Sequence, residues 1–109
     1  MQLAELTAML LALPGAEQSS HMGHTDFRVR GKIFASLPRP GRMVLKLTPD
    51  QQQMLTEGEP EIFETLPNAW GAKGWTAVAI DRLDAVTARS GMTMAWGNVA
   101  PKTLTRRLG

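Results

Sequence analysis

A helix start near the middle of the chain constrains the fold more than any other feature of the sequence. Thr48 is a typical N-cap residue, Pro49 suits the first helical position, and Asp50 lies at the positive end of the helix dipole. Gln51 completes a capping box, because its side chain can reach back to the N-cap backbone. These four residues predict a short helix that ends near Gly58.

Strand-like segments flank this helix on both sides. Four precede it, in residues 17–22, 27–30, 32–37 and 42–47, and two follow it, in residues 62–66 and 75–80. Residues 27–30 and 42–47 show the alternation typical of strands with one buried face. Because the strands do not alternate singly with helices, they predict an antiparallel sheet of the α+β class.

Two further helices are predicted near the ends of the chain. In residues 2–13, leucines at spacings of three and four form an apolar stripe of Leu3, Leu6, Leu10 and Leu13. In residues 84–99, capped by Asp81 or Asp84, the predicted buried stripe is Ala85, Ala88, Met92, Trp96 and Val99. Gly91 weakens this second helix by about 1 kcal/mol relative to Ala. The whole pattern predicts two layers, with five or six short antiparallel strands covered by about three helices.

Length and composition set the class of protein. A chain of 109 residues predicts one domain, residues 1–109, because two cores of half this size would be marginal. Cysteine is absent, which excludes a disulfide scaffold and suits a reducing cytosol. No apolar run approaches the roughly 20 residues that span a bilayer, and residues 1–13 contain Glu5 but no basic cluster, unlike a signal peptide. We therefore expect a cytoplasmic protein that does not engage a membrane.

Charge is distributed unevenly along the chain. Residues 26–48 contain six basic side chains and one acidic one, a local charge of +5, whereas residues 50–64 contain five acidic side chains and no basic one. The basic residues of the first segment are Arg28, Arg30, Lys32, Arg39, Arg42 and Lys46, and Lys102, Arg106 and Arg107 follow near the end. The pattern predicts either a nucleic-acid footprint or basic strands and an acidic helix facing each other across the surface.

The residues most suited to a metal are His21, His24 and Asp26, because two imidazoles and a carboxylate can form a three-ligand site. On a stretch that passes from strand to loop, however, the two rings are expected to diverge, which favours a hydrogen-bonded loop histidine. Ser19 and Ser20 precede His21, but neighbours along a strand point to opposite faces and no nucleophile-elbow motif is present.

A phosphate cradle needs glycines that open a helix, whereas Gly71 and Gly74 lie between predicted strands without Walker spacing. Asp50 and Asp81 stand at helix starts where an anion would otherwise bind. We therefore expect no enzyme activity, no catalytic residues, no metal and no cofactor.

Trp70 and Trp75 flank a basic turn that contains Lys73. Aromatic rings beside a cation can stack on bases and neutralise phosphate. The alternative is that both rings pack the edge of the sheet while Lys73 lies in solvent. Trp96, on the apolar stripe of the last predicted helix, is interpreted as a core residue.

Several segments together resemble the MmcQ/YjbR family, in family order and over about residues 2–108. They are residues 13–17 (Leu-Pro-Gly-Ala-Glu), 27–35, 45–49, the pair Gly74 and Trp75, and residues 99–102. The resemblance implies an antiparallel sheet covered by helices on one side, similar to secretion-chaperone-like and CyaY-like folds. Family members are commonly labelled DNA-binding because of a double-wing structural likeness, and no catalytic residues are carried over. The helix from Asp84 departs from the family pattern at Gly91, Met92 and Met94.

The sequence thus predicts a non-enzymatic binding domain whose partner is DNA. Two basic hairpin tips, residues 39–42 and 72–74, would act as wings against the phosphates. The residues expected to contribute are Arg28, Arg30, Lys32, Arg39, Arg42, Trp70, Lys73, Lys102, Arg106 and Arg107. The alternative is a protein-interaction module resembling secretion chaperones, including a homodimer, that uses a sheet edge or a helix face. DNA binding requires the basic residues to converge on one surface, whereas a protein partner requires an exposed apolar patch.

Overall fold

The computed structural model describes residues 1–108 and contains one antiparallel sheet of six strands in the order β1-β2-β3-β4-β6-β5. The strands are β1 (Ala16–His21), β2 (His24–Val29), β3 (Lys32–Arg39), β4 (Arg42–Lys46), β5 (Phe63–Thr65) and β6 (Trp75–Ala79). The helices are α1 (Leu3–Leu11), α2 (Pro49–Gly58), α3 (Ala69–Ala72), α4 (Ala85–Val99) and α5 (Lys102–Thr105), with a 3-10 turn η1 (Ile80–Arg82). The predicted fold class is confirmed, and α3 and α5 are additional to the predicted helices.

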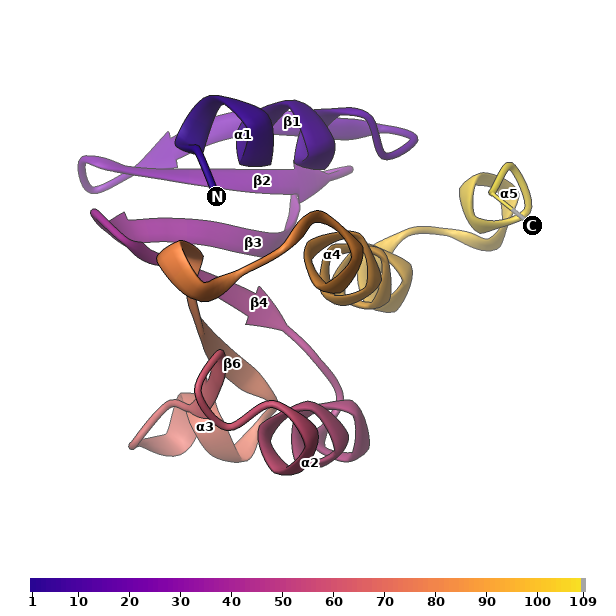
Figure 1. Ribbon diagram of the computed structural model, residues 1–109. Coiled ribbons are helices and arrows are strands. Elements are labelled where there is room, and N and C mark those ends of the chain that lie inside the picture. The colour runs from indigo at the N-terminus through magenta and orange to yellow at the C-terminus, as the bar shows by residue number, and fades with distance from the viewer. Residues whose placement is uncertain (109) are drawn as a thin grey trace.

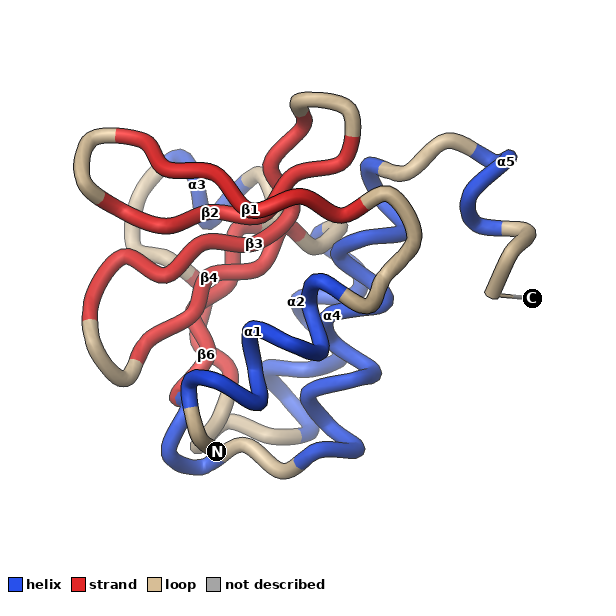
Figure 2. The backbone as a smooth tube through the Cα atoms, turned by 90° about the horizontal axis from the view of Figure 1, so that it is seen from above, coloured by secondary structure: helices blue, strands red, loops and turns tan. Residues whose placement is uncertain are grey.

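The helices α1, α2 and α4 lie on one side of the sheet, whereas α3 lies on the other (Figures 1 and 2). The side opposite α1, α2 and α4 is called the open face. It carries the alternate side chains of the strands, among them Arg28, Ile33, Val44, Lys46 and Trp75. No helix among the described residues is long and apolar enough to cross a membrane.

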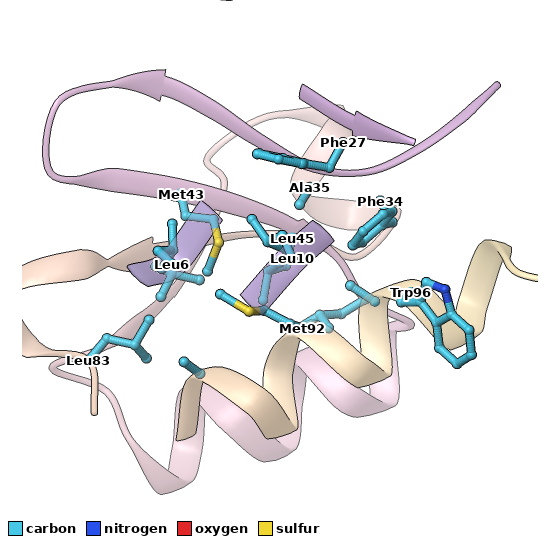
Figure 3. Packing of buried hydrophobic residues seen from close by; sticks show 14 of the residues in the cluster. Leu6, Leu10, Phe27, Phe34, Ala35, Met43, Leu45, Leu83, Met92 and Trp96 are labelled. Carbon is cyan, nitrogen blue, oxygen red and sulfur yellow. The ribbon is translucent and has the colours of Figure 1, made fainter. Parts of the chain in front are cut away.

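The core fills the space between the sheet and its helices (Figure 3). Met43 and Leu45 of β4 face Met92 of α4, and Leu6 and Leu10 of α1 complete this centre. Other large side chains of the strands and of α4 are also fully buried: Phe27, Phe34, Phe63, Val78 and Trp96. The prediction that Trp96 is a core residue is confirmed.

Two residues of the predicted apolar stripes are exposed, and Leu13 and Val99 are half-buried. Leu3 is 56% exposed and Ala85 is also exposed. Each is the first residue of its helix, and a helical Cβ points back toward the N-terminus, beyond the surface that the sheet covers. The predicted stripes were therefore one residue too long at their starts.

Gly91 has a packing role that its low helix propensity does not indicate. A Cβ at this position would lie 3.2 Å from Cδ1 of Leu45. The glycine therefore allows α4 to approach β4 closely, and the helix continues through it without interruption.

Side-chain caps fix the starts of α2 and α4. Thr48 accepts a hydrogen bond from the Gln51 amide at 3.1 Å, and the Gln51 side chain accepts one from the Thr48 amide at 2.9 Å, so the predicted capping box is confirmed. Asp84, rather than Asp81, caps α4 by accepting a 2.7 Å hydrogen bond from the Thr87 amide. That hydrogen bond lowers the pKa of Asp84.

Candidate functional site

Two tryptophans meet on the open face where β6 begins. The ring centroids of Trp70 and Trp75 are 6.1 Å apart and the rings are nearly perpendicular, at 77°. Nζ of Lys73 lies 5.5 Å from the centroid of Trp70, and Nζ of Lys46 lies 4.9 Å from that of Trp75. Each ring therefore carries its own cation, a favourable arrangement for an indole. Trp70 remains 56% exposed.

Close backbone contacts determine where this aromatic pair lies. Asn68 caps α3 by accepting a 3.0 Å hydrogen bond from the Trp70 amide. A Cβ on Gly71 would lie 1.8 Å from the carbonyl oxygen of Leu66, so only glycine fits there. The predicted wing at residues 72–74 is therefore wrong as an extended hairpin tip, because a short helix folds this segment onto the sheet.

A buried glutamine holds the same segment from the core side. Nε2 of Gln52, in α2, lies 3.0 Å from the carbonyl oxygen of Gly71. It also lies 3.1 Å from the carbonyl oxygen of Trp75 and 3.1 Å from the hydroxyl oxygen of Thr76. The Thr76 hydroxyl in turn donates to the Gly74 carbonyl at 2.9 Å. Because a buried amide must find partners, this network fixes α2, α3 and the start of β6 relative to one another.

A hollow of about 370 Å³ adjoins the tryptophan pair on the open face. Its lining is mainly apolar, with polar groups contributed by the β1–β2 hairpin and β3. The lining residues are His21, His24, Thr25, Asp26, Ile33, Ser36, Pro38, Val44, Leu66, Trp70 and Trp75. Apolar walls with a few polar groups are typical of small ligand sites.

Asp26 is a buried carboxylate in this hollow, and Arg28 neutralises it. Nε and one terminal nitrogen of Arg28 donate to the two Asp26 oxygens at 2.8 and 3.0 Å. The hydrogen bond from the guanidinium to this carboxylate raises the pKa of Arg28. The pair is electrically neutral as a unit, so Arg28 is not the free phosphate ligand that the sequence suggested.

The two histidines are strand residues that pair directly across the β1–β2 hairpin. His21 and His24 are register partners, and cross-strand partners share a face of the sheet. The expectation that they are loop residues with diverging rings is therefore wrong: Met22 and Gly23, both at positive φ, form a two-residue turn that brings them together. Within residues 1–108 no group of three His, Cys, Asp or Glu side chains lies close enough to hold a metal ion.

Strand register separates the basic residues into two groups. Lys46 pairs with Trp75, whereas Arg42 pairs with Ala79 and with Arg39 across the β3–β4 hairpin. The two positions on β4 are four residues apart, which is about 13 Å along a strand. The two predicted wings therefore lie at opposite ends of the sheet.

The other basic residues of the predicted site lie at the same end of the strands as the tryptophans, but toward the β1 edge of the sheet. Arg30 occupies the β2–β3 turn at a φ of 50°. Lys32 pairs with Val29, so neither of these two expected DNA-binding residues lies on the open face. The C-terminal segment is close by, because a Cβ on Gly15, just before β1, would lie 2.7 Å from Cδ1 of Leu104. Figure 1 shows α5 beyond this end of the sheet, and Lys102, Arg106 and Arg107 are exposed there.

Sequence reasoning found Trp70, Trp75 and Lys73 but did not assign Lys46 to the site. Alternation in β4 indicates that Lys46 is on the polar face, but its neighbour depends on which strand lies beside β4. That neighbour is β6, because β5 lies outside it at the edge. No local signal in the sequence carries this strand order.

A six-stranded antiparallel sheet with helices packed on one face defines a two-layer α+β domain, and the protein belongs to that class. The YjbR family model matches residues 11–97, so the chain belongs to the YjbR family and the predicted resemblance is confirmed. The crystal structure of Deinococcus radiodurans protein DR2400, described as a DUF419 domain, is similar, with a TM-score of 0.76 and 18% sequence identity. That similarity covers 99% of this chain and 88% of the other. No curated protein matches the chain.

Proposed function

We propose that this domain binds nucleic acid through the tryptophan end of the open face. The observation that carries the proposal is the pair of tryptophans with one lysine over each ring, on a face that α1, α2 and α4 leave uncovered. Nucleic acid presents both chemistries that this pair suits, since bases have flat π-faces and phosphates are anionic. Lys46 and Lys73 are the contacts closest to the rings.

Further cations lie at the same end of the strands but toward the β1 edge, and a longer nucleic-acid chain would pass them after leaving the tryptophans. Arg30 and Lys32 border the β2–β3 turn, and Lys102, Arg106 and Arg107 lie beyond it. The proposal leaves out Arg39 and Arg42, because they lie at the opposite end of β4. Stacking and phosphate contacts carry little sequence information, so we expect binding with little sequence preference.

We also propose that the domain acts by binding and catalyses no reaction. The ionisable groups that line the hollow are His21, His24 and Asp26. Both Asp26 oxygens accept hydrogen bonds from Arg28, and within the described residues no hydrogen bond joins either histidine to Asp26 or Ser36. A nucleophilic site typically has a nucleophile hydrogen-bonded to its base and a third group that orients the base.

Salt-dependent binding tests the proposed surface. A fluorescent 20-nucleotide oligonucleotide is titrated at 50 and 200 mM salt against wild type, a Lys46→Ala/Lys73→Ala variant and an Arg39→Ala/Arg42→Ala control that removes the same charge. Each lost phosphate contact should reduce the slope of log affinity against log salt by about 0.7 to 0.9. The first variant should therefore lose about 1.4 to 1.8 units of slope, and the control close to none. Absence of binding at 50 mM salt, or equal losses in the two variants, would contradict the proposal.

The β1 edge supports a second candidate, a protein-interaction module that forms a homodimer. Edge strands usually carry lysine, proline or bulges that prevent pairing. The β5 edge is only three residues long and is bordered by Glu61 and Pro67, whereas β1 has six exposed or half-exposed residues and neither lysine nor proline. An exposed edge of this kind can pair with another strand.

Cysteine cross-linking tests this candidate cleanly because the chain contains no cysteine. Ser19→Cys places a thiol near the middle of β1, and Thr103→Cys places one on the exposed surface of α5. If β1 pairs with a second β1, the first variant should form a disulfide-linked dimer much faster than the second under mild oxidation. Equal rates, together with a monomeric mass in light scattering, would reject the dimer.

A further inference from the structure

We infer that the hollow beside Trp70 accepts an unpaired base, so that the domain binds single-stranded nucleic acid in preference to duplex. This inference rests on the nucleic-acid function proposed above and specifies which form of nucleic acid the open face recognises.

The first observation is that Trp70 is exposed but held in place. Its side chain is 56% exposed, yet its backbone lies in a helix capped by Asn68 and fixed by the hydrogen bond from Gln52 to Gly71. An exposed tryptophan on a mobile loop would lose more conformational entropy when it bound a ligand. Here the ring is presented by a segment that the core already holds, as a stacking platform requires.

The second observation is the chemistry of the hollow that Trp70 and Trp75 border. Ile33, Val44 and Leu66 provide apolar walls, and His21, His24 and Ser36 add polar groups. A nucleobase has the matching distribution, with apolar faces and a rim of hydrogen-bond donors and acceptors. The volume of about 370 Å³ is in the range of small-ligand pockets.

The third observation is the position of the cations. Lys73 and Lys46 each lie over one of the two rings, so a chain whose base entered the hollow would have its phosphates near both ammonium groups. An apolar side chain of a protein partner would also fit the hollow, but it would gain nothing from these two cations. Charge complementarity therefore favours a polyanion as the occupant.

Geometry then distinguishes single strands from duplex. In a duplex both faces of every internal base are covered by stacked neighbours, and extruding one base costs a few kcal/mol. A recessed surface bordered by Trp70 and Trp75 cannot stack on a base that remains in the helix. A single strand offers its bases without that cost, so it should bind more tightly than duplex of the same length.

The test compares a 12-nucleotide oligo-dT with a 12-base-pair duplex by fluorescence anisotropy, using wild type and three variants. Trp70→Ala removes the platform, Trp70→Phe retains a smaller ring, and Val86→Ala, on the exposed surface of α4, is the control. Stacking on one base corresponds to roughly a 10-fold change in affinity. We expect Trp70→Ala to weaken oligo-dT binding about 10-fold, Trp70→Phe to restore part of it, and Val86→Ala to have no effect.

The outcomes separate this inference from the function on which it rests. If oligo-dT and duplex bind equally and Trp70→Ala changes neither, the base-accepting hollow is wrong while nucleic-acid binding stands. If neither binds at 50 mM salt, the proposed function itself fails. Thermal melts of each variant distinguish a loss of affinity from a loss of folding.

Discussion

Replacing Gly74 by alanine should destabilise the domain far more than a glycine-to-alanine change usually does. Gly74 has a φ of +105°, where a side chain is strained by about 1–2 kcal/mol or more. Its Cβ would lie 1.9 Å from the carbonyl oxygen of Leu47, so the backbone of one segment must move. That movement also weakens the 3.2 Å hydrogen bond from the Leu47 amide to the Gly74 carbonyl, worth about 1 kcal/mol.

These contributions amount to a loss of about 3 kcal/mol or more in the free energy of unfolding. For a domain of this size, such a loss lowers Tm by at least about 12 °C. Gly97→Ala is the matched control, because Gly97 lies in α4 with no atom within 4 Å of the added Cβ. The control should gain about 0.5 kcal/mol from its better helix propensity.

Urea unfolding followed by far-ultraviolet circular dichroism measures both variants without relying on tryptophan fluorescence. We expect the free energy of unfolding to fall in Gly74→Ala and to rise in Gly97→Ala. This expectation would be refuted if Gly74→Ala unfolded within about 0.5 kcal/mol of wild type, a difference typical of surface substitutions.

Three other predictions follow from single contacts. The hydrogen bond from the Thr87 amide lowers the folded-state pKa of Asp84. The stabilisation from this carboxylate is therefore complete well above the ordinary pKa of 3.8 and is lost as the pH falls through the lowered pKa. Asp84→Asn, which still caps the helix, should reduce the dependence of the free energy of unfolding on acid pH. Trp96→Phe removes the 2.8 Å hydrogen bond from the indole to the Pro14 carbonyl and should cost about 1–3 kcal/mol in chemical denaturation. Gln52→Leu removes the buried amide that donates toward the Gly71 and Trp75 carbonyls and the Thr76 hydroxyl, while both carbonyls keep a backbone donor. It should cost about 1 kcal/mol in the same assay and shift the tryptophan emission spectrum, and an unchanged spectrum would contradict its positioning role.

The fold was largely predictable because its strongest signals are local. The capping box at Thr48 and Gln51 fixed the start of α2, and alternation in β4 placed Met43 and Leu45 in the core. The short helix α3 was not predictable, because two of the residues in and after it are glycines with poor helix propensity. Tertiary contacts from Gln52 and Leu66 determine its conformation.

The candidate site was predictable only in part, for a related reason. Trp70, Lys73 and Trp75 are near one another in the sequence, so their association was expected. Lys46 joins them through the pairing of β4 with β6, which spans about thirty residues and skips β5. The same long-range register places Arg42 at the opposite end, and no local pattern reports it.

The charge pattern illustrates how burial changes the meaning of a basic residue. Arg28 contributes to the local excess of positive charge in the sequence, yet in the structure it neutralises the buried carboxylate of Asp26. A buried charge without a partner is costly, so the arginine's main electrostatic role is satisfied inside the chain. Counting charges along a sequence therefore overstates the surface available to a polyanion.

The three tryptophans allow the central claim to be tested in one spectrum. Each indole N–H gives its own signal in a ¹H–¹⁵N correlation experiment, and Trp96 serves as an internal control because it is buried and bonded to the Pro14 carbonyl. Titration with a short single-stranded oligonucleotide should shift the signals of Trp70 and Trp75 progressively and leave that of Trp96 in place. If the oligonucleotide binds while the signals of Trp70 and Trp75 do not move, the open face is not the nucleic-acid surface.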